Sequence, residues 1–221
     1  EINRVLTDHI STLLICPTNQ AVKNLKKEGF KNIIKQGELI GEREKINLNS
    51  LSESNPFVIN CGDIMYDVLI ESIKIAEKNK QILSKFSLLP KQYNLMTIHR
   101  EENTKNKETF QDLINFINKN SDNKKVIFPA HPRTKKLIET EKIKIPEKIQ
   151  IIEPVSYFDM LILLKNSNLL FTDSGGMQKE AYWLKIPCIT LREETEWIET
   201  VKSGWNVLYK KYKGKHTPKK D

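Results

Sequence analysis

The sequence has few cysteines, and they show none of the patterns of zinc-binding or disulfide-stabilised proteins. Only Cys16, Cys61 and Cys188 occur among 221 residues, and no two of them form a CxxC pair. A zinc site and a disulfide framework are therefore not indicated, and we expect a cytoplasmic protein that binds no metal. The sequence also lacks a signal peptide and any apolar run long enough to span a bilayer, so we expect no membrane partner.

The charged residues lack the clustering that nucleic-acid binding requires. Lysine and arginine number 36 against 28 acidic residues, which gives a net charge of +8. The lysines are spread along the chain, and the aromatic residues are not interleaved with them as a stacking platform would require. We interpret this as a solvated lysine-rich surface and expect no nucleic-acid partner. Residues 210–221 are basic without an apolar face, and we expect a disordered tail there.

Apolar runs and helical patterns alternate along most of the chain. Residues 34–56 interrupt the alternation, because they are rich in Gly, Glu, Asn and Ser and predict a surface loop that is long for a compact domain. The alternation predicts an α/β fold, with a Rossmann-like, doubly wound parallel sheet and helices on both faces. Strands are predicted at 11–16, 57–59, 93–98, 126–128, 149–152, 169–171, 187–191 and 205–209, and helices at 1–10, 18–28, 63–84, 107–119 and 134–140 and after Ser156 and Gly176.

The stretch 169–184 contains a strong ligand-binding signal. An apolar strand leads through Ser174 to Gly175 and Gly176, where a helix opens. Unobstructed N–H groups at a helix N-terminus bind anions, so this turn predicts a phosphate site, although Ser174 could also serve only as an N-cap. Glu180 lies one turn beyond Gly176 on the same helix face. Its carboxylate could accept two hydrogen bonds from a ribose diol, or it could be a solvated helix charge.

Polar residues also follow the other predicted strands, and ligands of doubly wound sheets bind at the carboxyl ends of strands. His99 could donate to a phosphate or transfer a proton, and Arg100 could clamp a phosphate or pair with a neighbouring glutamate. His131 lies in a rigid turn and has a structural or a functional role. Arg192 could contact a sugar or only hold its turn. Because such residues recur at consecutive strand ends, we favour a ligand site.

Three residues close to this edge are predicted to have no part in binding. Lys179 precedes Glu180 on the helix and is interpreted as a solvated helix charge. Trp183 and Trp197 are interpreted as packing residues and not as stacking platforms for a base.

The ordered motifs of the chain resemble those of the non-hydrolysing UDP-N-acetylglucosamine 2-epimerases. Together they are highly specific, and the similarity covers nearly everything from Glu1 to about Leu208. The motifs are HREENT at 99–104, HP at 131–132, TDSGGMQKEA at 172–181, LREETEW at 191–197 and GWN at 204–206, preceded by ExNR with Asp8, CPT, AVKNLKKEG at 21–29 and GDIMYD at 62–67.

The resemblance implies a two-domain fold like that of the B-type glycosyltransferases. Residues 1–61 would be the C-terminal part of the first Rossmann-like domain, and residues 62–209 would be the second, UDP-binding domain. The implied reaction interconverts UDP-GlcNAc and UDP-ManNAc by elimination of UDP across C1–C2 and re-addition, without a cofactor, and supplies ManNAc-type sugars for cell-surface polysaccharide. Family members are usually dimers, so a homodimer of the full-length protein is expected by analogy.

The resemblance also implies roles for individual residues. His99 would assist the departure and return of the diphosphate, and Ser174–Gly176 would bind the phosphates. Glu180 would bind the ribose hydroxyls, and Phe158 with its neighbours would border the uracil. Arg192 is assigned to substrate binding.

Two residues match positions that contact a second, regulatory UDP-GlcNAc in bacterial members of the family. These residues are Arg100 and His131.

The chain departs from the family pattern at both ends. After Leu208 the family pattern continues with helices that return to the first domain, whereas this chain ends in the basic segment 210–221. The acids that move the C2 proton lie upstream of Glu1, no initiator methionine is present, and the predicted loop at 34–56 is longer than the family pattern. We therefore expect a fragment that binds UDP weakly and does not epimerise. The alternatives are a glycosyltransferase of the same fold that uses a UDP-sugar donor, and a non-catalytic UDP-binding module.

Overall fold

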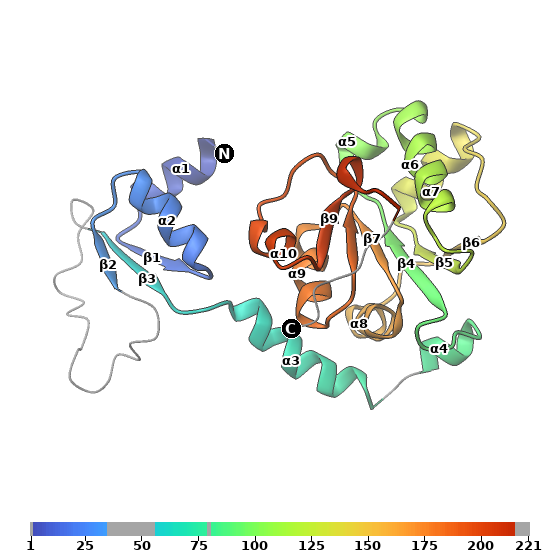
Figure 1. The fold of residues 1–221 in the computed structure, drawn as a ribbon, viewed down its shortest axis with the longest axis horizontal. Coiled ribbons are helices and arrows are strands. Elements are labelled where there is room, and N and C mark those ends of the chain that lie inside the picture. The colour runs from blue at the N-terminus through green and yellow to red at the C-terminus, as the bar shows by residue number, and fades with distance from the viewer. Residues whose placement is uncertain (1, 35–55, 79–80, 215–221) are drawn as a thin grey trace. The chain divides into compact units, whose positions relative to one another are not determined.

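The computed structural model describes residues 2–34, 56–78 and 81–214, and they form two compact units, Glu1–Val68 and Leu69–Asp221. Residues 35–55 of the predicted loop and residues 215–221 of the predicted tail lie outside the described residues. The units are described separately below, and Figure 1 labels their elements.

The first unit is a small parallel sheet of order β1-β3-β2 with two helices that contact each other. Its strands are β1 (Leu13–Cys16), β2 (Asn32–Ile34) and β3 (Phe57–Asn60), and its helices are α1 (Ile2–His9) and α2 (Asn19–Lys27). Thr18 caps α2, because its hydroxyl accepts the N–H of Ala21. The core consists of the buried residues Leu14, Cys16, Leu25, Phe30 and Val58.

The second unit is built on a six-stranded sheet in which all paired neighbours are parallel, in the order β6-β5-β4-β7-β8-β9. The chain runs outward from β4 to β6, returns to the other side of β4 for β7, and runs outward again to β9. The reversal between β4 and β7 is the topological switch point at which doubly wound sheets bind ligands. The strands are β4 (Tyr93–Thr97), β5 (Lys125–Pro129), β6 (Ile149–Ile152), β7 (Leu170–Thr172), β8 (Cys188–Thr190) and β9 (Asn206–Leu208).

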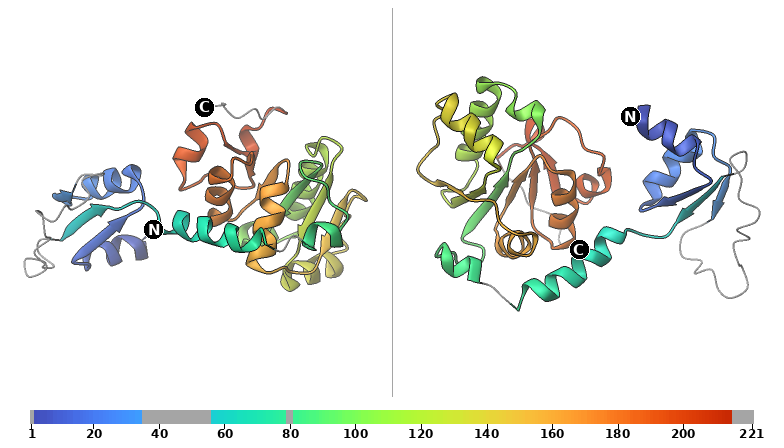
Figure 2. Two further views of the ribbon diagram at one scale, coloured as in Figure 1. Left: turned by 90° about the horizontal axis from the view of Figure 1, so that it is seen from below. Right: turned by 180° about the vertical axis from the view of Figure 1, so that it is seen from behind.

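Helices cover both faces of this sheet, as Figure 1 and the two further views in Figure 2 show. Successive strand residues point to opposite faces, so Leu95 and Leu170 pack toward α4, α8 and α9, whereas Met96 and Phe171 pack toward α6 and α7. The helices are α3 (Ile64–Ala76), α4 (Gln81–Lys85), α5 (Glu101–Thr104), α6 (Lys107–Lys119), α7 (Pro132–Thr140), α8 (Tyr157–Asn166), α9 (Gly175–Trp183) and α10 (Ile198–Lys202).

The predicted fold class is confirmed: the chain is α/β with parallel sheets, and the sheet of the second unit is doubly wound. Some elements differ from the prediction. The single helix expected at 63–84 is wrong, because α3 ends at Ala76 and α4 begins at Gln81. The short elements β2, α5 and α10 were not predicted. Among the described residues, no helix has the length and apolar character needed to cross a membrane.

The part of the basic tail that the structure describes is attached to the second unit. Tyr209–Lys211 forms a 3-10 turn. The rings of Tyr209 and Tyr212 both meet Phe116 edge-on, with ring centroids 5.8 and 6.1 Å from it. Tyr212 thus supplies the apolar contact that the lysine-rich composition of this segment concealed.

Candidate functional site

The candidate site lies at the switch point, where the loops after β4 and β7 diverge. A hollow of about 450 Å³ opens beside them. Its lining is mainly apolar and also includes Thr97, His99, His131 and Arg133. The apolar lining residues are Ile98, Pro129, Pro154, Val155, Met160 and Met177.

The N-terminus of α9 forms one wall of the site. The Ser174 hydroxyl caps the helix by accepting the N–H of Met177. Within the described residues, the N–H groups of Gly175 and Gly176 meet no acceptor, which is the usual condition of the first turn of a helix. Ser174 can therefore cap the helix while the turn binds a phosphate, because the cap uses only the N–H of Met177.

The space at Gly175 is occupied by side chains from two other loops. A Cβ atom at this position would lie 3.3 Å from Trp197 Nε1, 3.7 Å from Glu196 Oε1 and 3.9 Å from an Arg100 guanidinium nitrogen. The Trp197 contact favours glycine here, because a Cβ would require the indole to shift by a few tenths of an ångström, whereas the other two distances are ordinary van der Waals contacts. The Arg100 cation thus lies beside the positive end of the α9 dipole, and the two together favour an anion.

Glu180 lies one turn into α9 and is buried, with 7% of its surface exposed. Its carboxylate accepts a hydrogen bond of 3.0 Å from the Tyr157 hydroxyl. Burial raises the pKa of the Glu180 carboxyl, and the Tyr157 hydrogen bond lowers it only in part. The solvated-charge alternative for Glu180 is therefore excluded.

The Tyr157 hydroxyl is held in the same environment. Burial of its hydroxyl end, followed by the neighbouring Glu180 carboxylate, raises its pKa to about 12. Tyr157 therefore remains a neutral donor, although the residue as a whole is 44% exposed. One Glu180 carboxylate oxygen is left without a hydrogen bond among the described residues, and a diol could donate to it.

Asp173, at the end of β7, is fully buried. Its Oδ2 atom accepts hydrogen bonds from the backbone N–H groups of His99 and Arg100 and from the side-chain amide of Asn103, each 3.0 Å long. His99 Nδ1 lies 3.3 Å from Oδ1 of the same carboxylate. The Asn103 amide also donates to the Leu191 carbonyl at 3.0 Å. Asp173 thus joins the loop after β4 to the α9 turn.

Arg192 is held between two loops by acidic residues. Its guanidinium lies 2.7 Å from Glu196 and 3.3 Å from Glu102. Glu196 is also 3.8 Å from Arg100. Burial raises the pKa of the Glu196 carboxyl, but a backbone hydrogen bond, Arg192 and Arg100 outweigh it, so the net pKa is lowered. These ion pairs support the alternative that Arg192 holds its turn. Arg100 pairs with Glu196, and not with Glu101 or Glu102 beside it in the sequence.

The prediction that Lys179 is a solvated charge was wrong. Lys179 is only 5% exposed, and its ammonium lies 4.0 Å from the ring centroid of Trp197 and 5.1 Å from that of Trp183. Next to it, the buried Gln178 accepts a 2.6 Å hydrogen bond from Thr195. These contacts fix segment 191–197 against α9. Trp183 and Trp197 pack, as expected, but they pack around a cation.

Two predicted residues are placed at the margins of the site. His131 is the N-cap of α7, and its Nδ1 accepts the Arg133 N–H at 3.3 Å, which supports a structural role, although His131 also lines the hollow. Phe158 is 42% exposed and is not among the residues that line the hollow, whereas Met160 is. The border of the uracil therefore stays a prediction for Phe158.

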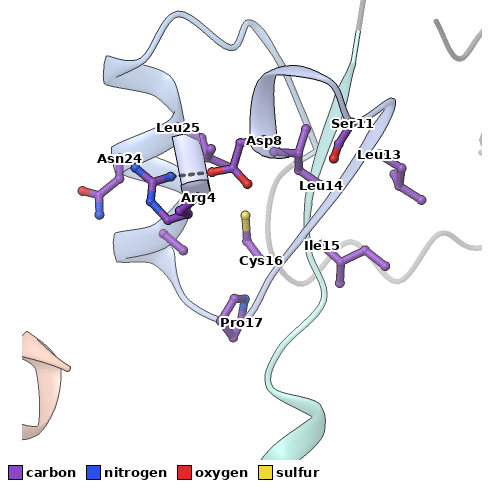
Figure 3. A pocket seen from close by; sticks show the side chains of 11 residues that line it. Arg4, Asp8, Ser11, Leu13, Leu14, Ile15, Cys16, Pro17, Asn24 and Leu25 are labelled. Atoms are coloured by element: carbon purple, nitrogen blue, oxygen red, sulfur yellow. Dashed lines mark hydrogen bonds and ion pairs between the residues drawn. The ribbon is translucent and has the colours of Figure 1, made fainter. Parts of the chain in front are cut away.

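The first unit has a hollow of its own, of about 340 Å³, shown in Figure 3. Arg4 enters it from α1, but its guanidinium pairs with Asp8 and lies 2.6 Å from Glu28. The Cys16 thiol is buried beside it, and burial, then Asp8 and Cys61, raise the thiol pKa. The arginine that lines this hollow is thus already paired, and the raised pKa favours the neutral form of the Cys16 thiol.

The family profile described as UDP-N-acetylglucosamine 2-epimerase matches residues 1–216. The chain belongs to this family. It is 46% identical over 214 residues to a UDP-N-acetylglucosamine 2-epimerase homolog of Methanococcus maripaludis, covering 94% of this chain and 52% of the relative. It is 42% identical over 216 residues to the UDP-N-acetylglucosamine 2-epimerase of Methanocaldococcus jannaschii, with 94% and 53% covered. The chain thus spans about half the length of the curated relatives it matches.

Solved structures of the epimerase family have the same fold. A crystal structure of the M. jannaschii UDP-GlcNAc 2-epimerase in complex with UDP-GlcNAc and UDP matches with a TM-score of 0.74 and 41% identity, covering 94% of this chain and 53% of that one. The Neisseria meningitidis enzyme bound to UDP-GlcNAc matches with a TM-score of 0.66 and 27% identity, covering 94% and 52%. These neighbours confirm the predicted membership of the glycosyltransferase-B-like fold.

Sequence reasoning missed several residues that build the site. Asp173, Asn103 and Tyr157 form its hydrogen-bond framework. Tyr157 was predicted only as a neighbour of Phe158 at the border of the uracil, Asp173 only as a polar residue after a strand, and Asn103 had no predicted role of its own. Asp173 could have been found, because a carboxylate directly after a fully apolar strand is buried and must be paired. Nothing in the local sequence identifies Asn103 or Tyr157.

Proposed function

We propose that the second unit binds the UDP part of UDP-N-acetylglucosamine at the switch point, for interconversion of UDP-GlcNAc and UDP-ManNAc. The observation that carries the proposal is the buried Glu180 carboxylate one turn from the α9 N-terminus. A buried carboxylate is costly unless hydrogen-bonded, and Glu180 accepts one hydrogen bond from Tyr157. A ribose diol would supply further hydrogen-bond donors to this carboxylate. With the diphosphate of the same nucleotide at the α9 N-terminus, the ribose would lie about one helix turn away, where Glu180 is.

The other parts of the nucleotide have matching surfaces. The diphosphate would accept hydrogen bonds from the N–H groups of Gly175 and Gly176 and pair with Arg100, which lies beside them. The uracil would enter the apolar hollow next to Met160. His99, which also lines that hollow, would face the diphosphate.

The reaction we propose is elimination of UDP across C1–C2 of the sugar, followed by re-addition with the opposite configuration at C2. Charge develops on the departing diphosphate, where the α9 N-terminus, Arg100 and a proton from His99 would stabilise it. The carboxylates nearest the turn are already engaged, since Asp173, Glu180 and Glu196 all have hydrogen-bond or ion-pair partners. The C2 base would therefore come from outside the described site. We expect the 221-residue chain to bind UDP without epimerising UDP-GlcNAc.

Two measurements on this chain test the proposal. Isothermal titration calorimetry should give one UDP site, with uridine binding at least tenfold more weakly because it lacks the diphosphate. Proton NMR of UDP-GlcNAc in D₂O with the chain should show neither deuterium at C2 nor UDP-ManNAc. Absence of UDP binding would overturn the proposed site, and rapid formation of UDP-ManNAc would overturn the assignment of the base.

The proposal extends to the longer protein in three respects. A protein that spans the full length of the relatives should epimerise UDP-GlcNAc, work in the cytoplasm for polysaccharide synthesis, and be a homodimer. Light scattering on such a protein tests the dimer, and a monomer that still epimerises would remove it from the proposal. Contact of Arg100 and His131 with a second, regulatory UDP-GlcNAc also stays a prediction.

A further inference from the structure

We propose that Asp173 is a positioning residue that holds the His99 imidazole with Nδ1 toward the protein and Nε2 toward the ligand. The functional meaning of this orientation rests on the proposed function, in which His99 faces the diphosphate. The orientation itself rests only on the contacts around Asp173.

The first argument is the burial of the carboxylate. Asp173 has no exposed surface, whereas the His99 side chain is 52% exposed. A buried carboxylate must be matched by donors, and Oδ2 receives three of them at 3.0 Å. Oδ1 has the His99 backbone N–H at 3.3 Å and the His99 ring nitrogen at 3.3 Å. Both oxygens thus face the segment that carries His99.

The second argument concerns the proton on the ring. An ionised carboxylate only accepts hydrogen bonds, so an imidazole nitrogen that faces it must carry a proton. In the neutral ring that proton is on Nδ1, which leaves the Nε2 lone pair on the exposed side. Nε2 can then take up a proton and give it to the departing diphosphate.

The third argument is the position of Asp173 in the chain. Asp173 directly precedes Ser174, so one residue is attached both to His99 and to the turn that would hold the phosphates. Asn103 extends the connection, because its amide reaches Asp173 and the Leu191 carbonyl at 3.0 Å each. A change at Asp173 should therefore alter the geometry of the imidazole relative to the α9 N-terminus.

The experiment is ¹⁵N NMR of the imidazole rings in the full 221-residue chain. The chain contains 4 histidines, and His99→Gln identifies the signals of His99. For neutral His99 in the wild type we expect the Nδ1–H tautomer. In Asp173→Asn, the amide oxygen should replace Oδ2 and keep its three donors, so the amide NH₂ faces Nδ1 and reverses the tautomer to Nε2–H. The matched control Asp112→Asn, on the exposed face of α6, should leave the His99 signals unchanged.

A second variant separates positioning of the ring from support of the loop. Asn103→Ala removes the tie to Leu191 but keeps the carboxylate beside His99, so the Nδ1–H tautomer should persist. In a protein that spans the full length of the relatives, Asp173→Asn should lower kcat about a hundredfold or more, with KM changed less than threefold.

The outcomes separate this inference from the proposed function. If wild-type His99 is the Nε2–H tautomer, or if Asp173→Asn leaves its signals unchanged, the positioning role is wrong even where UDP binds. The wild-type measurement decides this even if the Asp173→Asn chain does not fold. If the tautomers behave as expected but UDP does not bind, the proposed function fails and the Asp173–His99 arrangement stands.

Discussion

The hollow of the first unit and the α9 turn of the second unit differ in whether their hydrogen-bond donors are already paired. In the first unit, the Arg4 guanidinium is neutralised by Asp8 and Glu28. In the second unit, the N–H groups of Gly175 and Gly176 meet no acceptor among the described residues, and Arg100 lies next to them in a looser ion pair, 3.8 Å from Glu196. Both arginines have carboxylate partners, so the unpaired donors that distinguish the second unit are the backbone N–H groups of Gly175 and Gly176.

The carboxylates of the two units also differ in whether a cation pairs with them. Asp8 and Glu28 are partly exposed and pair with a cation, so their charges need no ligand. Glu180 is buried and accepts a hydrogen bond only from the neutral Tyr157 hydroxyl among the described residues. Perturbed, under-paired carboxylates mark functional sites more often than paired surface ones. The predictions below test this difference, beginning with the largest effect.

Substitution of Glu180 should weaken UDP binding, whereas substitution of Glu28 in the first unit should not. Glu180→Gln keeps the size of the side chain but removes the charged acceptor of the ribose hydroxyls, and hydrogen bonds to charged groups contribute about 1.5–3 kcal/mol. We expect UDP affinity to fall roughly 10- to 100-fold by calorimetry. Glu28→Gln should change it less than twofold. Equal effects of both substitutions would contradict the comparison.

Lys179 gives the next largest expected effect, on stability. Lys179→Met removes the cation from between Trp183 and Trp197, and desolvated cation–π contacts contribute about 2 kcal/mol. We expect the free energy of unfolding in urea to fall by about 1–2 kcal/mol. Lys23→Met, on the exposed face of α2, is the control and should change it by less than about 0.5 kcal/mol. An unchanged Lys179→Met variant would show that the two rings pack equally well around an apolar chain.

Glu180→Gln should also stabilise the free chain, and the gain should depend on pH. Burial raises the pKa of the Glu180 carboxyl in the folded state. The stabilisation that this shift gives the folded wild-type chain is therefore fully present below the unfolded-state pKa, and it is lost as pH rises through the folded-state pKa. At pH 7 the substitution should therefore raise the free energy of unfolding by on the order of 1 kcal/mol, or about 2–4 °C in Tm. Below the unfolded pKa the gain should disappear. A variant less stable than wild type at pH 7 would contradict a costly buried charge.

The smallest effect is expected in the first unit. Glu28→Gln breaks one of the ion pairs of the partly exposed Arg4, and such pairs contribute about 0–1 kcal/mol. The change in unfolding free energy should be within this range and should shrink further in 1 M salt. A loss several times larger, persisting in salt, would show that Arg4 organises the hollow in Figure 3.

Local signals in the sequence were sufficient for the fold. Alternating apolar runs predicted the parallel sheet, and Thr18, Ser156 and Ser174 predicted helix starts that the structure confirms as side-chain caps. Because polar residues followed consecutive strands, the edge that carries the site was also predictable. Short elements such as β2 and α10 were missed, since three to five residues give too little periodicity to detect.

The pairing within the site was not predictable from the sequence. Asp173 and His99 are separated by 74 positions, and Tyr157 and Glu180 by 23. Lys179 looked solvated because its helix position was judged alone, whereas its burial depends on a tryptophan from another loop. Such contacts follow from how the loops fold over the sheet, and hydrophobic periodicity does not encode this.

The most direct test of the central claim is a UDP titration of the ¹⁵N-labelled chain, followed by backbone amide chemical shifts. The account predicts saturable shifts centred on Gly175, Gly176 and His99, with the amides around Arg4 and Asp8 unchanged. Saturable shifts centred on Arg4 and Asp8, or no shifts at either hollow at millimolar UDP, would contradict it.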